Sequence, residues 1–214
     1  MNEIVFGDFR NFGFPLDCFV VSDTPYNQGY HYSKYTDNLE DKEYYEMLTA
    51  AFNSKKSVVI SYPEETINLF GGGRFGVCEQ VVCWVYNSNT AKQSRLISWW
   101  NCKPDMRKIS QPYKNPKDKR IAKRIAEGKT ARAYDWWEIN QVKNVSKKHS
   151  HPCPIPYELA KRIILTTTQK NDLIIDPFAG IGTVLKAAKD TGRRWLGFEI
   201  DEEYHKIAIE LLSQ

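Results

Sequence analysis

Short apolar runs and amphipathic stretches take turns along most of the chain, and this order predicts strands that alternate with helices. The apolar runs, at residues 3–6, 18–22, 57–61, 77–86, 173–175 and 195–198, are typical of buried strands. Apolar residues at helical spacing predict helices over residues 41–52, 64–70, 156–167, 183–190 and 204–211. Residues 27–41 follow neither period and are expected to form a loop. The alternation implies an α/β fold, with a doubly wound, mostly parallel sheet and helices on both faces.

Suitable residues stand at the ends of the predicted helices. Asp41 is a candidate N-cap for the first helix, and Gly71, Gly72 and Gly73 are expected to end the second. Pro156 is expected to open the third, because proline is favoured at the first helical position.

The pattern changes at residues 87–150, which are basic, polar and rich in tryptophan. Six cations fall between residues 119 and 132, around a short predicted helix over residues 121–127. Trp-Trp pairs at 99–100 and 136–137 flank these cations, and one member of each pair is expected in a core. We therefore expect residues 1–86 and 151–214 to build one sheet, with residues 87–150 as a small basic insertion.

The composition narrows the class of protein. A chain of 214 residues with 42% hydrophobic residues can build one domain with a real core. Its net charge of +4 is weak evidence for a nucleic-acid partner, so the distribution of the charge matters more. The sequence has no apolar run of about 18 residues and no evident signal peptide, which points to a cytoplasmic protein without a membrane partner.

The cysteines and histidines argue against a disulfide framework and a metal site. Five cysteines are an odd number, and the absence of a Cys-x-x-Cys pair favours reduced thiols. The four histidines are not spaced as a ligand cluster, so we expect no metal.

A glycine-rich loop follows the strand at residues 173–175 and reads Asp-Pro-Phe-Ala-Gly-Ile-Gly-Thr from Asp176 to Thr183. Gly180 and Gly182 let the backbone turn tightly near a ligand, and the next helix points its amide donors there. The loop lacks the third glycine of the dinucleotide fingerprint and the Gly-Lys-Ser/Thr of a P-loop. Glu199 ends the next strand, where an acid can accept hydrogen bonds from both ribose hydroxyls of a nucleoside. The glycines alone would fit an ordinary strand-turn-helix equally well.

The segment Asp23-Thr24-Pro25-Tyr26 ends the strand at residues 18–22 and carries groups that can activate an aromatic amino group. Such a nitrogen is a poor nucleophile because its lone pair is delocalised into the ring. The Asp23 carboxylate and the Thr24 carbonyl can each accept one amino proton, which draws the lone pair out of the ring. Pro25 stiffens the loop, and Tyr26 offers a flat face for a base. In isolation, the same residues could form a simple turn.

Together these motifs resemble those of the amino-group DNA methyltransferases, which modify adenine-N6 or cytosine-N4. Their circular order resembles the beta class, with the catalytic motif first, the target-recognition region next and the cofactor motif last. Residues 1–86, 87–150 and 151–214 would be these three parts. The resemblance implies the sheet of the S-adenosylmethionine-dependent methyltransferases and S-adenosylmethionine as the cofactor.

The resemblance also assigns roles to residues. Asp8 resembles the early acidic motif that reaches the cofactor's adenine, although it could be a turn former. His151, Pro152 and Cys153 resemble the start of the segment that leads into the cofactor-side helix, although Pro152 and Pro156 could explain that geometry alone. The catalytic residues implied are Asp23, Thr24, Pro25 and Tyr26. The cofactor-binding residues implied are Asp8, Asp23, His151, Pro152, Cys153, Asp176, Phe178, Ala179, Gly180, Gly182, Thr183 and Glu199.

Two positions depart from the family pattern. Thr24 replaces the first proline of the catalytic motif, which keeps the backbone carbonyl but makes the loop less rigid. Ile155 replaces the usual lysine and removes a contact to the charged methionine end of the cofactor. Both departures concern rate more than the type of reaction.

The basic segment is expected to contact DNA, because cations meet phosphates and aromatic rings can stack on bases. A solvated surface helix is the alternative for any single cation. A target base must leave the duplex, and residues 27–41, with Tyr30, Tyr32 and Tyr35, are the expected lid over it. The candidate DNA-binding residues are Lys103, Arg107, Lys108, Lys119, Arg120, Lys123 and Arg124.

The expected function is methylation of an exocyclic amino group in double-stranded DNA. Adenine-N6 is favoured, because cytosine-N4 relatives more often have serine where Asp23 stands. Cytosine-N4 methylation, RNA methylation and a non-catalytic DNA-binding relative are the alternatives. The resemblance leaves open a homodimer and a restriction endonuclease partner.

Overall fold

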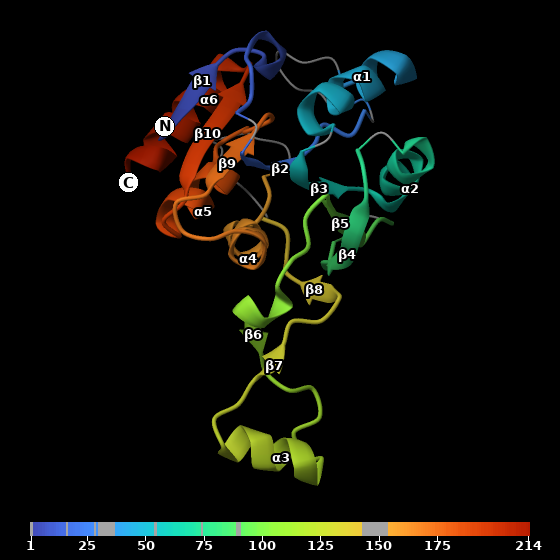
Figure 1. Ribbon diagram of the computed structural model, residues 1–214, viewed down its shortest axis with the longest axis vertical. Coiled ribbons are helices and arrows are strands. Elements are labelled where there is room, and N and C mark those ends of the chain that lie inside the picture. Colours follow the sequence, from blue (N-terminus) through green and yellow to red (C-terminus); the bar gives the residue numbers. More distant parts are fainter. Residues whose placement is uncertain are drawn as a thin grey trace.

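A single large sheet forms the body of the protein. The computed structural model describes residues 2–15, 17–27, 29, 37–53, 55–73, 75–88, 91–142 and 154–214. Eight strands follow the order β1-β10-β9-β2-β3-β5-β4-β8 (Figure 1). The pairs β3–β5 and β5–β4 are antiparallel and the other pairs are parallel, which confirms a mostly parallel sheet. The strands are β1 Asn2–Phe6, β2 Phe19–Asp23, β3 Lys56–Ser61, β4 Cys78–Val85, β5 Ser94–Trp100, β8 Trp136–Glu138, β9 Leu173–Asp176 and β10 Arg194–Glu199.

Helices cover both faces of the sheet, and the alternation of side chains along each strand separates two cores. In β9, Ile174 packs with the helices on one face, while Leu173 and Ile175 pack on the other. The first core includes residues of α4 and α5, and the second includes residues of α1 and η1. None of the helices in the described ranges is long and apolar enough to cross a membrane. The helices of the body are η1 Phe9–Asn11, α1 Asp41–Phe52, α2 Pro63–Gly72, α4 Tyr157–Thr167, α5 Thr183–Asp190 and α6 Glu202–Ser213.

The ends of several helices differ from the prediction. The N-cap of α1 is Glu40, without a side-chain cap, and Asp41 is already inside the helix. Helix α2 begins at Pro63 and continues through Gly71 and Gly72 before it ends. Pro156 is the N-cap of α4, one residue before the first helical position. Each shift is one or two residues, because hydrogen bonds of the first and last turns are weakly specified by sequence.

Two strands from residues 87–150, where we expected an insertion, belong to the sheet itself. Strand β5 lies between β3 and β4, and β8 pairs with β4 at the sheet edge. The alternation of β5 places Trp99 in one core and Trp100 in the other, so both are buried where we expected one. Of the second pair, Trp137 is buried and Trp136 is half-buried. Only a shorter part of residues 87–150 therefore lies outside the large sheet.

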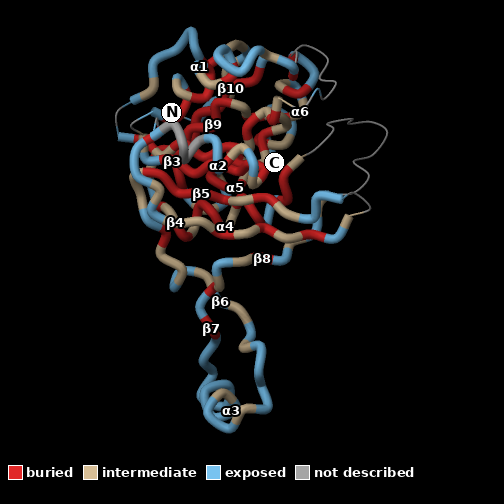
Figure 2. The backbone as a smooth tube through the Cα atoms, turned by 90° about the vertical axis from the view of Figure 1, so that its right-hand side faces the viewer, coloured by how far each residue is buried: buried red, intermediate tan, exposed pale blue. Residues whose placement is uncertain are grey.

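That segment, residues 103–134, forms an arm that extends away from the body (Figures 1 and 2). The arm contains η2 Met106–Lys108, the short pair β6 Ser110–Gln111 and β7 Ala131–Arg132, and helix α3 Lys119–Ala126 at its tip. Trp100, the last residue of β5, lies opposite Ser57 near the start of β3. Because β3 is parallel to β2, β9 and β10, the arm leaves the sheet at the amino-terminal edge of these strands.

Candidate active site

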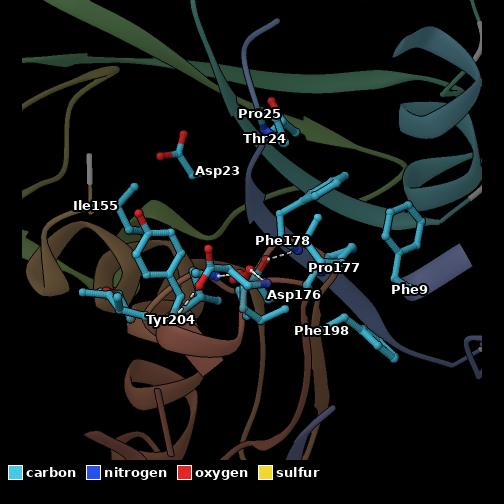
Figure 3. Close-up of a pocket in the computed structure, with 18 of the residues that line it drawn as sticks. Phe9, Asp23, Thr24, Pro25, Ile155, Asp176, Pro177, Phe178, Phe198 and Tyr204 are labelled. Carbon is cyan, nitrogen blue, oxygen red and sulfur yellow. Dashed lines mark hydrogen bonds between the residues drawn. The ribbon is translucent and has the colours of Figure 1, made fainter. Parts of the chain in front are cut away.

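Four acidic residues meet at the opposite, carboxyl-terminal edge of the sheet. The neighbouring strands β1, β10, β9 and β2 are followed by or end in Asp8, Glu199, Asp176 and Asp23, respectively. All four residues line one pocket, and Figure 3 shows Asp23 and Asp176 at this pocket. The pocket includes the boundary between β9 and β2, from which the chain continues in opposite directions across the sheet. Such a switch point is where open α/β sheets bind ligands.

The loop after β9 is fixed by its own aspartate and by the next strand. Asp176 Oδ1 accepts hydrogen bonds from Ser22 Oγ at 2.5 Å and from the Phe178 amide at 3.2 Å. Gly180 has a φ of 52° and Gly182 a φ of 84°, in the left-handed region that favours glycine. Burial raises the pKa of Asp176 to about 7 despite these hydrogen bonds.

Glu199 joins this loop to β10. Its Oε2 accepts a hydrogen bond from the Gly180 amide at 2.7 Å, and its Oε1 accepts one from the Asp201 amide at 2.8 Å. Burial raises the pKa of Glu199. These two backbone bonds orient the carboxylate. Each oxygen can accept two hydrogen bonds, so each can still accept one from a ligand hydroxyl.

Asp8 is held differently, by a cation beside it. Arg10 binds both carboxylate oxygens, with its Nη2 2.6 Å from Oδ2, and its amide donates to Oδ1 at 2.9 Å. Burial raises the pKa of Asp8, but these bonds lower it more, so that the net pKa lies below its usual value. Asp8 is the N-cap of η1 and also lines the pocket, so a turn-forming role and a ligand-binding role are both compatible with its position.

The loop after β2 brings its aspartate to the same pocket. The Tyr26 hydroxyl donates a hydrogen bond to Asp23 Oδ1. The carbonyl of Pro25 accepts a hydrogen bond from the hydroxyl of Tyr44 on α1 at 2.9 Å, which anchors the loop to that helix. Burial raises the pKa of Asp23 to about 6, although the charge of Arg95 and the Tyr26 hydroxyl act in the opposite direction. An ionised, partly exposed carboxylate near neutral pH is suited to accept hydrogen bonds from a substrate.

Tyr26 lies deeper than a stacking platform requires. Its side chain is only 3% exposed, and its ring contacts Tyr62, with 4.8 Å between the ring centroids. The guanidinium of Arg95 lies 4.7 Å from the Tyr26 ring centroid. In this structure Tyr26 supports Asp23 through its hydroxyl. The expected lid tyrosines, Tyr30, Tyr32 and Tyr35, lie outside the described residues.

The chain matches a known protein family over most of its length. A family model described as DNA methylase, N6_N4_Mtase, matches residues 18–210. The chain belongs to this DNA methylase family. The match includes β2 with Asp23 and the β9 loop with Asp176, so the predicted family is confirmed.

The individual relatives match different lengths of this chain. It is 30% identical over 137 residues to the Type II methyltransferase M.BglII of Bacillus subtilis, which covers 59% of this chain and 38% of that protein. It is 36% identical over 78 residues to the DNA adenine methyltransferase YhdJ of Escherichia coli (strain K12), covering 36% of this chain and 26% of that protein. The chain thus spans well under half the length of these relatives.

Solved structures confirm the fold class of this chain. The PvuII DNA methyltransferase (cytosine-N4-specific) has a TM-score of 0.68 at 16% identity, and the match covers 97% of this chain and 85% of that one. The M1.HpyAVI–SAM complex has a TM-score of 0.66 at 17% identity and covers 100% of both chains. The second structure is a complex with S-adenosylmethionine, in agreement with the cofactor expected for this family.

The other residues expected to bind the cofactor are described only in part. Phe178, Ala179, Gly180 and Thr183 line the pocket, and Gly182 is the N-cap of α5, so their role in cofactor binding stays a prediction. His151, Pro152 and Cys153 lie outside the described residues. Ile155, which stands where lysine was expected, is buried and lines the pocket close to the start of α4.

The candidate DNA-binding cations all lie on the arm, away from the pocket. Lys119, Arg120, Lys123 and Arg124 are exposed on α3 at the tip of the arm. At its base, Arg107 pairs with Asp105, and Lys108 Nζ donates to the carbonyl of Thr168 at 2.9 Å. Lys103 is exposed nearby. The structure therefore places these cations in two groups, one at the tip and one at the base of the arm, and both groups lie away from the four acids.

Several pocket residues were missed by the sequence prediction. Phe9, Met47 and Tyr204 line the pocket, and the Phe9 ring meets that of the predicted Phe178 edge to face, with 5.2 Å between the ring centroids. The three missed residues come from η1, α1 and α6 and share no motif. The charge pattern alone places Arg95 with the basic residues of the insertion, yet it is 1% exposed. Its position beside three apolar residues, Leu96, Ile97 and Trp99, was the available signal.

Proposed function

We propose that this protein methylates an exocyclic amino group of a base in double-stranded DNA, with S-adenosylmethionine as the methyl donor and adenine-N6 as the target. The observation that carries the proposal is the convergence of Asp23 with Asp176 and Glu199 at one pocket. The family match supports DNA as the substrate, and the similar proteins include both a DNA adenine methyltransferase and a cytosine-N4-specific DNA methyltransferase.

The chemistry of the pocket fits the cofactor. S-adenosylmethionine carries positive charges, and acids line this pocket, which favours a cation. Phe9 and Phe178 provide apolar surface for an adenine ring, and Glu199 is oriented to accept hydrogen bonds from ribose hydroxyls. When bound, the cofactor supplies a methyl group activated by a positively charged sulfur.

Asp23 would then prepare the attacking nitrogen. Its carboxylate accepts one amino proton, and the backbone carbonyl of Thr24 is the proposed second acceptor. Transfer would form one N–C bond at this nitrogen while the bond between the methyl carbon and the cofactor sulfur breaks, with its electron pair staying on sulfur. The nitrogen would then release one proton to solvent. Pro25 and its bond to Tyr44 keep the loop in place during this step.

The arm is the proposed DNA-contacting region. Its four helix cations occupy positions i, i+1, i+4 and i+5 of α3, so they share one side of the helix and can follow one phosphate backbone. Because the arm leaves the edge opposite the pocket, these phosphates belong to DNA some distance from the target base, or to DNA held by a second copy of the chain. A homodimer is therefore part of the proposal to be tested.

One assay tests the proposed function and its alternatives. The protein is incubated with methyl-labelled S-adenosylmethionine and, separately, double-stranded DNA, RNA and carrier protein. We expect label only in DNA, recovered as N6-methyladenine after digestion to nucleosides. Recovery as N4-methylcytosine would correct the base, and label in RNA would correct the substrate. If the protein bound DNA but transferred no labelled methyl group, it would be a non-catalytic DNA-binding relative.

A further inference from the structure

Arg95 is a fully buried cation directly behind the catalytic loop. It lies on β5 with 1% of its surface exposed. Its guanidinium carbon lies 4.7 Å from the ring centroid of Tyr26, 5.0 Å from that of Tyr62, 5.4 Å from Trp84 and 5.8 Å from Tyr86. Its Nη2 also donates to the Tyr62 hydroxyl at 3.4 Å. Four aromatic rings therefore form a cage around one positive charge.

The position of this charge is unusual for the surrounding core. Ile97 and Trp99 follow Arg95 on the same side of β5, and both are completely buried in the apolar core. Burying a guanidinium costs free energy that aromatic faces offset only in part. An apolar residue at position 95 would continue the apolar side formed by Ile97 and Trp99 without this cost. Arg95 lies at the end of this side that is nearest the pocket, because the next residue, Leu96, pairs with Ser61 at the carboxyl-terminal end of β3.

We propose that Arg95 is a positioning residue for methyl transfer: its guanidinium fixes the Tyr26 ring, and its charge keeps the Asp23 carboxylate ionised inside the protein. Tyr26 connects the two residues, because its ring contacts Arg95 and its hydroxyl binds Asp23. A protonated Asp23 would keep its own proton and lose its capacity to accept the amino proton at that oxygen. This inference rests on the proposed function.

The groups that face Asp23 support this role of Arg95. Glu65 on α2 is close enough to interact with Asp23, but burial raises the pKa of Glu65 to about 8, which favours its neutral, protonated form. Asp176 on β9 also interacts with Asp23, and its own pKa is raised to about 7. Tyr26 donates a hydrogen bond from the same loop. Lys92 lies over Tyr62, with its Nζ 4.1 Å from the ring centroid, and faces Glu65 from the exposed side.

Replacement of Arg95 by neutral residues tests the proposal. Arg95→Met and Arg95→Gln remove the positive charge, and Arg95→Lys keeps it. The matched control is Lys92→Met, which removes a more exposed cation that also lies over the Tyr62 ring. The titration of the Asp23 carboxyl is followed by carbon NMR in the protein without cofactor or DNA, with Asp23→Asn to assign the signal. The pH dependence of kcat/KM for DNA methylation is measured for the same variants.

In the neutral variants we expect the midpoint of the Asp23 titration, and the acid limb of kcat/KM, to move up by about one pH unit. The rate should recover at high pH, and Arg95→Lys and Lys92→Met should keep the parental midpoint. An unmoved Asp23 titration in a folded neutral variant overturns the inference, as does failure of both neutral variants to fold. Because the NMR titration needs no turnover, a parent protein that fails to methylate DNA would contradict only the proposed function.

Discussion

The pocket edge of the sheet and the arm at the opposite edge carry opposite charges and are built in different ways. At the pocket, Asp176 and Glu199 are buried, and backbone amides bind their oxygens. On the arm, α3 has no buried residue, and the four cations of its cationic side are exposed (Figure 2). A single change at the pocket should therefore abolish one step of the reaction, whereas the arm should respond to the number of charges removed.

The largest effect is expected at Asp23, the proposed catalytic aspartate. Asp23→Ala should lower kcat by about a hundredfold to a thousandfold, because one preorganised acceptor is lost, while cofactor affinity remains. Rapid-quench methyl transfer and calorimetry measure the two quantities. The control is Asp17→Ala, because Asp17 is an exposed aspartate just before the start of β2. Near-normal turnover of Asp23→Ala would place the catalytic group elsewhere.

The next largest effect is expected in the cofactor loop. Gly180→Val should weaken S-adenosylmethionine binding by about thirtyfold or more, because a branched side chain fills the approach and strains a backbone with a φ of 52°. Gly128→Val is matched in strain, with a φ of 70°, but lies on the arm with open space around it. Equal affinity of both variants in calorimetry would contradict the assignment of the loop.

The arm should show a graded response. Alanine at Lys119, Arg120, Lys123 and Arg124 should weaken DNA binding by about tenfold at physiological salt and reduce the salt slope by up to about four units. The loss should be similar for all DNA sequences, because phosphates carry no base information. Cofactor binding should not change. Replacement of the exposed Lys42, Lys170 and Lys206 on the body is the control, and an unchanged salt slope in the arm variant would reduce α3 to a solvated surface.

The smallest effect is expected at Thr24. Thr24→Pro should leave kcat within about threefold of the parent or raise it, since proline fixes only its own φ and restricts the preceding residue to extended backbone. Asp23, the preceding residue, is already in strand β2. A folded but inactive Thr24→Pro variant, measured in the same transfer assay, would reveal a role for the threonine hydroxyl.

The same contrast explains what the sequence could predict. Asp23 and Asp176 could be found because each ends an apolar run, and burial leaves such a run few alternatives to a parallel strand. The cage of Arg95 could not, because its rings come from residues 26, 62, 84 and 86, which meet only through strand pairing. The direction of the arm depends on the antiparallel orientation of β5, and local composition does not encode orientation. The sequence shows the cations of the arm, but it does not show that they lie far from the pocket.

The four carboxyl groups at one edge make folding and ligand binding depend on protons. The folded-state pKa of Asp176, about 7, lies above its ordinary value of 3.8, so the folded chain holds a proton that the unfolded chain releases between these values. Without ligand, this group therefore lowers the free energy of unfolding as the pH rises through that window. A positively charged ligand reverses the preference, because it stabilises the ionised form. Binding of such a ligand should then release protons from Asp23 and Asp176 near pH 6 to 7. The pocket would exchange these protons for the bound cation.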